Sequence, residues 1–181
     1  MKKWLLAMGL TGALVLAGCG SDSTASEENG NASQSEETET KQDETAVKKQ
    51  LLATQMNIKD AFKEQQAKIS DYEAAISAEE PDTETITTAA DEAKAAADEA
   101  AKKAADYSIE AELPEDVTTQ VQEAVASLQA YYEEVAAALE ENPESADFTL
   151  AEEQFTQFND QLGALYEEVG LLAPDMKKEL S

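Results

Sequence analysis

Hydrophobic residues between Thr45 and Pro81 recur at alternating steps of four and three, the spacing that places side chains on one face of an α-helix. This face consists of two glutamines, Gln55 and Gln65, and the hydrophobic residues Leu51, Ile58, Phe62, Ile69, Tyr72 and Ile76. A proline pushes the residue before it out of the helical region, so we expect Pro81 to end this first helix. We interpret the two glutamines as residues that fix the register against partner helices; the alternative is that they contact a ligand in the core.

The next segment has a helical face made almost entirely of alanine: Ile86, Ala90, Ala93, Ala97, Ala100, Ala104 and Tyr107. Asp82 or Thr83 offers a side-chain oxygen that can cap its N-terminus. Alanine favours the helix and lets a neighbouring helix approach closely, so we expect a thin helix packed tightly against bulkier partners. Because alanine buries little area, the alternative is a solvated helical arm.

The third hydrophobic face begins after Pro114, which suits the first turn of a helix because its missing N–H is not needed there. It contains Val117, Val121, Val125, Leu128, Tyr132, Val135 and Leu139, and it is widened by Ala124, Tyr131 and Ala138. Asn142 and Pro143 end the segment. Because Tyr131 and Tyr132 are adjacent in the sequence, we expect one of them to lie at a boundary or on the surface.

Thr149 and Glu152 have the spacing of a capping box, in which each side chain reaches the other's free backbone N–H, so we expect them to begin the fourth helix. Its face is the most hydrophobic in the chain and contains Ala151, Phe155, Phe158, Leu162, Leu165, Val169 and Leu172. We expect Gly170 to loosen or end this helix and Pro174 to limit it. Residues 175–180 can then add a short terminal turn.

Four amphipathic helices joined by connections of a few residues, with no period-two alternation, predict an all-α domain at residues 45–181. We expect an antiparallel up-down four-helix bundle; the alternative is a three-helix bundle with an alanine-rich helical arm. The first helix is longer than its partners require, so it either kinks or projects beyond the bundle at its N-terminal end.

Residues 20–44 contain no large hydrophobic side chain. Such a segment cannot bury enough surface to offset the conformational entropy it would lose on folding. We therefore expect residues 19–44 to form a disordered acidic tether before the helical domain.

The first residues of the chain have the layout of a secretory signal peptide: a positive start at Lys2 and Lys3, a hydrophobic run, and then small residues. The run is too short for a membrane-spanning helix of about 20 residues. At its end, Leu16-Ala17-Gly18-Cys19 resembles the lipobox of bacterial lipoproteins. The resemblance implies that residues 1–18 are removed, that Cys19 is acylated, for example with palmitate, and that the protein is exported to the outer face of the cell membrane. A long acidic spacer after the lipobox is more typical of Gram-positive lipoproteins.

The full chain has 39 acidic residues against 13 basic ones, and its formal net charge is −26 at pH 7. A field of this sign repels nucleic acid and anionic lipid, so we exclude direct binding to nucleic acid. We expect the protein to reach the membrane through the lipid on Cys19 instead.

The residues that common enzyme mechanisms need are missing from the sequence. It has no histidine, and its single cysteine is the lipidated one, so a Ser-His or Cys-His nucleophile cannot form. Calcium is the metal best suited to the many carboxylates, with Asp82 and Asp147 as conceivable ligands, but the sequence has no D-x-D-x-D-G loop. We therefore expect no enzyme, no catalytic residue, no cofactor and no metal site.

These observations favour a non-enzymatic, membrane-anchored lipoprotein whose helical bundle contacts another protein of the cell envelope. The candidates for a contact patch are residues left over after the four faces are assigned: Tyr131, Leu150, Tyr166 and Leu171. The alternative is a small-ligand or cation-binding lipoprotein that serves a membrane transporter. A pocket lined by Gln55, Gln65 and a tyrosine would favour this alternative, whereas a solid core with an exposed apolar patch would favour protein contact.

Overall fold

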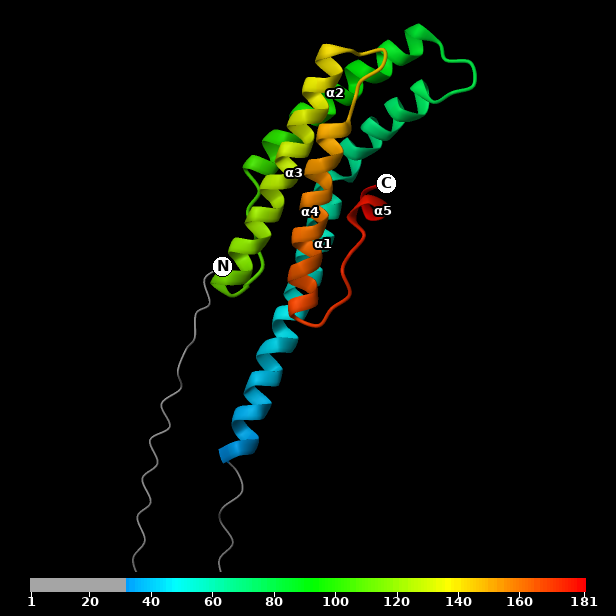
Figure 1. The fold of residues 1–181 in the computed structure, drawn as a ribbon. Coiled ribbons are helices and arrows are strands. Elements are labelled where there is room, and N and C mark those ends of the chain that lie inside the picture. The colour runs from blue at the N-terminus through cyan, green and yellow to red at the C-terminus, as the bar shows by residue number, and fades with distance from the viewer. Residues whose placement is uncertain (1–31) are drawn as a thin grey trace, which may run out of the picture.

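The computed structural model describes residues 32–181, with side chains from Glu44 onward. Over this range the chain is all-helical, with α1 (Ala32–Ile76), α2 (Thr83–Ala105), α3 (Glu115–Glu141), α4 (Thr149–Glu168) and the short α5 (Met176–Leu180). The four long helices pack against one another, which confirms the predicted all-α class (Figure 1). The predicted signal peptide, the lipobox-like residues 16–19 and the first part of the expected tether lie outside the described residues.

Helix α1 is longer than the sequence pattern predicts. It contains 45 residues, and it includes residues 32–44, which the composition assigns to the tether. These residues contain no proline or glycine, so a helix that is stabilised in the core can continue through them one hydrogen bond at a time. The N-terminal end of α1 extends beyond the other helices, which was one of the two outcomes expected for a helix of this length (Figure 1).

Two of the expected signals for helix ends are confirmed, and one is displaced. Asp82 caps α2, because its carboxylate accepts a hydrogen bond of 2.9 Å from the backbone N–H of Thr85. Asn142 follows the last residue of α3, as expected. By contrast, α1 ends at Ile76, five residues before Pro81, so the proline does not itself terminate that helix.

The predicted capping box of α4 is wrong. Thr149 is already the first helical residue, and the residue before it, Phe148, has no side-chain hydrogen bond that caps the helix. Asp147 takes this role instead, since its carboxylate accepts hydrogen bonds from both the backbone N–H and the hydroxyl of Thr149, at 3.0 and 2.6 Å. The start of the helix is therefore held by a residue two positions earlier than the pattern indicated.

Gly170 ends α4 and turns the chain back. Its φ of 71° suits glycine. The two hydrogen bonds of a Schellman motif close the helix here, from Gly170 N–H to the Glu167 carbonyl and from Leu171 N–H to the Tyr166 carbonyl. We expected Leu172 to belong to the hydrophobic face of this helix, which is wrong. Because the helix stops at Glu168, Leu172 lies beyond it and is 93% exposed.

The alanine face of α2 is fully packed. Ala93, Ala97 and Ala100 have no exposed surface, and α2 lies against both α1 and α3. Lys103, in the last turn of α2, donates a hydrogen bond of 2.8 Å from its ammonium group to the Ala61 carbonyl of α1. This bond also holds the two helices together. The alternative of a three-helix bundle with a solvated alanine-rich arm is therefore wrong.

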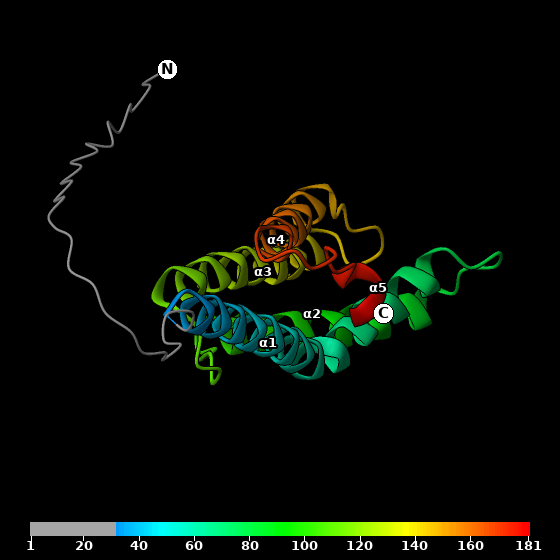
Figure 2. The ribbon, with the colours of Figure 1, turned by 90° about the horizontal axis from the view of Figure 1, so that it is seen from below.

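The gap between α1 and α4 is closed by the C-terminal segment. Each long helix packs against the next one in the sequence, but α1 and α4 do not pack along their lengths. Instead α5 lies against α1, on the side that faces α4, and it buries Met176 and Leu180 (Figure 2). Gly163 helps the returning segment approach α4, because a Cβ atom there would come within 3.3 Å of the Ala173 Cβ.

We predict that Ala97→Leu lowers the free energy of unfolding by about 1–3 kcal/mol, because a larger side chain overpacks the contact of α2 with its neighbours. The measurement is a urea unfolding curve. Ala95→Leu is the matched control, since Ala95 lies on the exposed side of the same helix and the same change should be nearly neutral there. Equal effects of the two substitutions would contradict close packing of α2.

Candidate ligand-binding site

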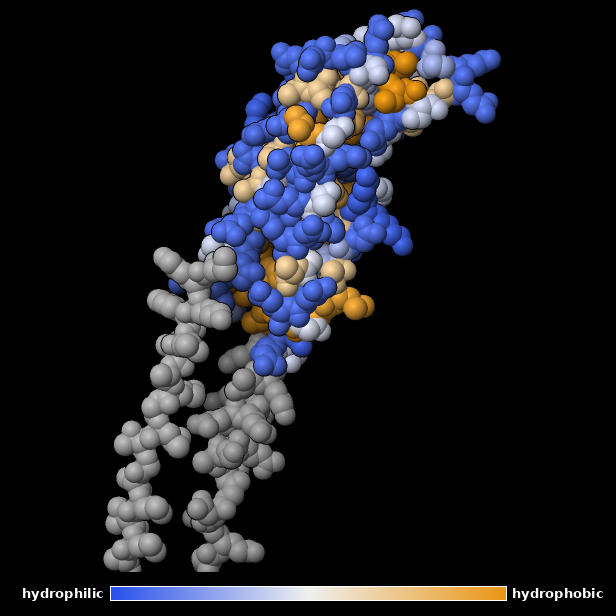
Figure 3. Space-filling model, in the orientation of Figure 1, coloured by the Kyte–Doolittle hydropathy of each residue, from blue (hydrophilic) through white to orange (hydrophobic). Residues whose placement is uncertain are grey.

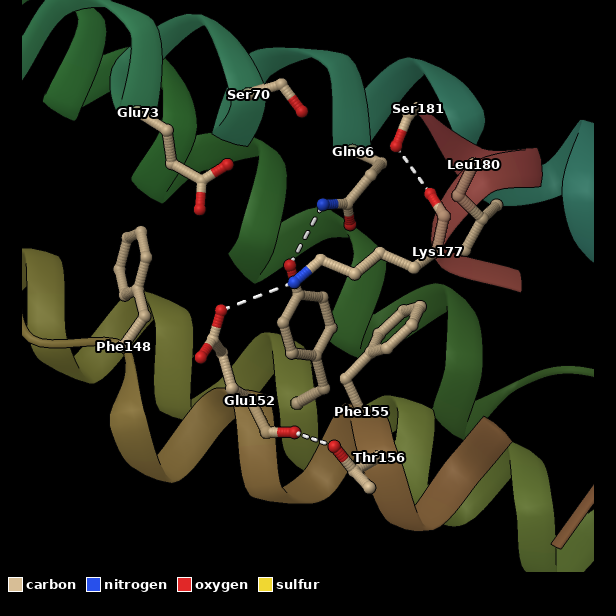
Figure 4. A pocket seen from close by; sticks show the side chains of 11 residues that line it. Gln66, Ser70, Glu73, Phe148, Glu152, Phe155, Thr156, Lys177, Leu180 and Ser181 are labelled. Atoms are coloured by element: carbon tan, nitrogen blue, oxygen red, sulfur yellow. Dashed lines mark hydrogen bonds and ion pairs between the residues drawn. The ribbon is translucent and has the colours of Figure 1, made fainter. Parts of the chain in front are cut away.

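A cavity of about 140 Å³ lies where α5 closes the gap between α1 and α4 (Figure 4). Three helices and the α3–α4 connection contribute its walls, together with the end of the chain. The lining residues are Gln66, Ser70 and Glu73 from α1, Tyr131 from α3, Phe148, Glu152, Phe155 and Thr156 from the connection and α4, and Lys177, Leu180 and Ser181 from the C-terminal segment. The cavity therefore exists only because residues far apart in the sequence meet at this point.

Hydrogen bonds hold the C-terminal segment in place beside the cavity. The Asn159 side-chain oxygen accepts a hydrogen bond of 3.0 Å from the Met176 backbone N–H, which ties α5 to α4. Gln55 donates a hydrogen bond of 2.6 Å to Glu179, which ties α5 to α1. Asp175 caps α5 by accepting a hydrogen bond from the Lys178 N–H. These contacts fix the position of Lys177, whose side chain crosses the cavity toward α4 (Figure 4).

The charged side chains that line the cavity are two carboxylates, Glu73 and Glu152, and one ammonium group, Lys177. Lys177 Nζ lies 3.3 Å from a Glu152 carboxylate oxygen, and both side chains are largely exposed, so this ion pair is weak. Among the described residues, the Glu73 carboxylate has no ion pair and no hydrogen bond. Glu73 is exposed as a whole, but partial burial of its carboxylate raises its pKa above the usual range. Lys177 partly offsets this rise in pKa, and Glu152 adds to it.

The polar group at the inner wall is a pair formed by Gln66 and Tyr131. The Gln66 amide donates a hydrogen bond of 3.0 Å to the Tyr131 hydroxyl oxygen. This leaves the buried Gln66 Oε1 without a partner among the described residues, although a buried acceptor normally has one. Burial raises the pKa of Tyr131 to about 12, so its hydroxyl stays neutral at physiological pH.

Aromatic rings form the apolar part of the wall. Phe155 packs edge to face against Tyr131, with ring centres 5.1 Å apart. Phe148 packs against Tyr72 at 5.7 Å, and the Tyr72 hydroxyl accepts a hydrogen bond of 2.8 Å from the Ala146 N–H. The connection that carries Phe148 is thus fixed to α1, and the cavity combines rigid rings with a few polar groups, as small-molecule sites do.

The structure moves two predicted patch residues into the core. Tyr166 is 1% exposed, and its hydroxyl donates a hydrogen bond of 2.7 Å to the Leu51 carbonyl of α1. Tyr131 is 7% exposed, Leu171 packs partly buried against the core, and Leu150 alone is largely exposed, at 61%. The four residues therefore do not form the expected surface patch, because α3 and α4 each bury more than one stripe of residues.

Tyr131 and Tyr132 are both buried, against the expectation that one would lie at a boundary or on the surface. Helix α3 has neighbours on two sides, since it packs against both α2 and α4. Adjacent side chains that point about 100° apart can therefore both meet the core. Tyr132 stacks on Phe62 at 5.7 Å, but its hydroxyl has no hydrogen-bond partner among the described residues.

The glutamines singled out by the sequence act mainly between helices. Gln65 is buried and donates a hydrogen bond of 3.1 Å to Glu99 of α2, and Gln55 bonds to Glu179 of α5. Both uses are those of residues that fix register, and neither side chain lines the cavity. The glutamine that does line it, Gln66, follows the predicted face by one position, and nothing in its spacing marks it.

The turns considered for calcium have another role. The Asp82 and Asp147 carboxylates accept hydrogen bonds from threonines at helix starts, and these bonds from Thr85 and Thr149 lower the pKa of each aspartate. In the part of the chain whose side chains are described, no group of three or more His, Cys, Asp or Glu side chains is arranged to hold a metal ion. Likewise, none of the helices described has a hydrophobic stretch suited to crossing a membrane.

The surface outside the cavity is mostly hydrophilic. On the face shown in Figure 3, hydrophobic residues form small separate areas rather than one continuous patch. The large hydrophobic side chains that are exposed in the described part of the chain are Leu52, Met56, Leu150 and Leu172. Single exposed side chains of this kind are common on folded domains.

The chain matches no protein-family model, and comparisons with curated proteins and with solved structures find no significant match.

We predict that Tyr166→Phe lowers the free energy of unfolding by about 1 kcal/mol, because it removes a buried hydrogen bond between α4 and α1. Tyr132→Phe is the matched control. It removes a buried hydroxyl that has no partner, so it should be neutral or stabilising. Urea unfolding curves of both variants test this, and a larger loss for Tyr132→Phe would contradict the hydrogen bonding described above.

Proposed function

We propose that this protein is a bacterial lipoprotein, held at the outer face of the cell membrane by a lipid on Cys19, whose helical domain binds a small ligand. The lipobox Leu16-Ala17-Gly18-Cys19 supports the anchor, and the cavity beside α5 supports ligand binding. The underlying architecture is an antiparallel up-down bundle, which the packing of each long helix on the next supports. Binding without catalysis agrees with the lack of histidine and of a free thiol in the sequence.

The observation that carries this proposal is a cavity with a rigid aromatic wall and unpaired polar groups. Phe148 and Phe155 offer apolar surface, while Glu73 and the Gln66 Oε1 have no partner among the described residues. A cavity of about 140 Å³ is similar in size to one that holds benzene in another protein. It therefore suits a ligand of about six to eight non-hydrogen atoms, which an anchored lipoprotein would deliver to a membrane transporter.

A second candidate function is contact with another envelope protein. It is supported by Leu52 and Met56, which are 46% and 63% exposed and lie one turn apart on α1. Two side chains make a small contact area compared with a stable protein interface, which buries about 800 Å² on each partner. The cavity is therefore the better-supported site.

We predict that Cys19→Ala leaves the protein unprocessed or released from the membrane, because the acyl chains hold it there. Fractionation of cells, followed by mass measurement of the protein in each fraction, checks this. Retention of the variant in the membrane at the mature mass would show that the lipid is not the anchor.

We predict that Thr156→Phe abolishes ligand binding, because Thr156 lines the cavity and a phenyl ring there takes up space that the ligand needs. Thr88→Phe on α2 is the matched control, since both threonines are exposed and donate the same hydrogen bond to the carbonyl four residues earlier. The measurement is native mass spectrometry of the purified protein after incubation with spent growth medium. Wild type and Thr88→Phe should carry a small bound mass that Thr156→Phe lacks. If all three carry none, the proposed function is wrong.

A further inference from the structure

We propose that the cavity beside α5 binds a small organic cation, namely a protonated amine or quaternary ammonium group on a compact apolar body. This inference rests on the proposed function and names the chemical class of its ligand. It follows from the charges, the unpaired acceptors and the aromatic rings that line the cavity.

The charges of the cavity are not balanced. Glu73 and Glu152 point into it from opposite walls, one on α1 and the other on α4 (Figure 4). Lys177 is the only basic residue in the lining, and it pairs with Glu152 at 3.3 Å. Glu73 is left without a counterion among the described residues. One positive charge on a ligand would therefore balance the charged side chains of the lining. The strongly acidic chain adds a field of the same sign, which attracts cations.

The uncharged groups of the lining also suit a cation. An ammonium group donates hydrogen bonds and accepts none, and the buried Gln66 Oε1 is an acceptor without a donor. Phe148 and Phe155 present rings at the same cavity, and an aromatic ring attracts a cation to its face. The apolar body of the ligand can pack on these rings and on Leu180, while its charge lies toward Glu73.

Anionic and neutral ligands fit this lining less well. An anion would approach Lys177, but it would then lie beside Glu152, which holds that lysine, and near the unpaired Glu73. A neutral ligand would cover part of the Glu73 carboxylate without offering it a positive charge, which costs free energy. A cation removes this penalty, and this difference should set the selectivity of the site.

Three probes of similar size and different charge test the inference on the purified full-length protein in detergent. Cyclohexylamine is a cation at pH 7, cyclohexanol is neutral and cyclohexanecarboxylate is an anion. Isothermal titration calorimetry should give binding of cyclohexylamine at least about tenfold tighter than that of cyclohexanol, as for a hydrogen bond to a charged group. Cyclohexanecarboxylate should bind more weakly than both.

Glu73→Gln should reduce the affinity for cyclohexylamine by about tenfold or more and leave that for cyclohexanol nearly unchanged. Glu144→Gln is the matched control, because Glu144 lies exposed in the α3–α4 connection and its replacement changes the net charge by the same amount. An equal loss in both variants would show only the general field of the acidic chain, and it would overturn the role of Glu73.

The outcomes separate this inference from the proposed function. If cyclohexanol binds as tightly as cyclohexylamine and Thr156→Phe abolishes both, the cavity binds ligands but the preference for cations is wrong. If cyclohexylamine does not bind while Thr156→Phe still removes a bound mass acquired from growth medium, the inference fails and the proposed function stands. If no probe binds and no mass is acquired, both are wrong.

Discussion

The return of the C-terminal segment across the gap between α1 and α4 is the contact on which the rest of the structure depends. Apart from local contacts such as the hydrogen bond from Tyr166 to the Leu51 carbonyl, α1 and α4 do not pack along their lengths, so part of their inner faces would be open to water. Met176 and Leu180 fill that space, and the turn at Gly170 directs the chain toward it. The same segment brings Lys177 opposite Glu152 and so completes the cavity.

Side-chain size and polarity are matched across the other contacts. The alanines of α2 allow close approach, and the large rings of Phe62 and Tyr132 stack between α1 and α3. Tyr131, 4.8 Å from Tyr132, packs on Phe155 of α4 instead. Polar residues at the edges of these contacts are paired across helices, as Gln65 is with Glu99. An apolar core with a few such pairs has fewer alternative registers, because a shifted helix would leave the pairs unmade.

The candidate site was only partly predictable. The sequence suggested that a ligand-binding cavity would be lined by Gln55, Gln65 and a tyrosine. A cavity is present, but Gln66 and Tyr131 line it, and Gln55 and Gln65 do not. Glu73 and Lys177 look like any other charged residues of an acidic chain. Their relation depends on the position of α5, which five residues of helix in isolation do not determine.

The sequence by itself determined the four long helices, several of their ends and the all-α class, because local spacing and capping act over a few residues. The packing of the alanine face, which the sequence left open, was decided by the tertiary structure. The sequence also carries Leu16-Ala17-Gly18-Cys19, whose resemblance to a lipobox is visible without any fold. Only the tertiary structure decided that Tyr131, Tyr132 and Tyr166 are all buried and that α5 packs against α1. Periodicity shows which residues share a face, but not which faces meet. That choice is made by contacts between distant segments, such as the hydrogen bond from Tyr166 to the Leu51 carbonyl.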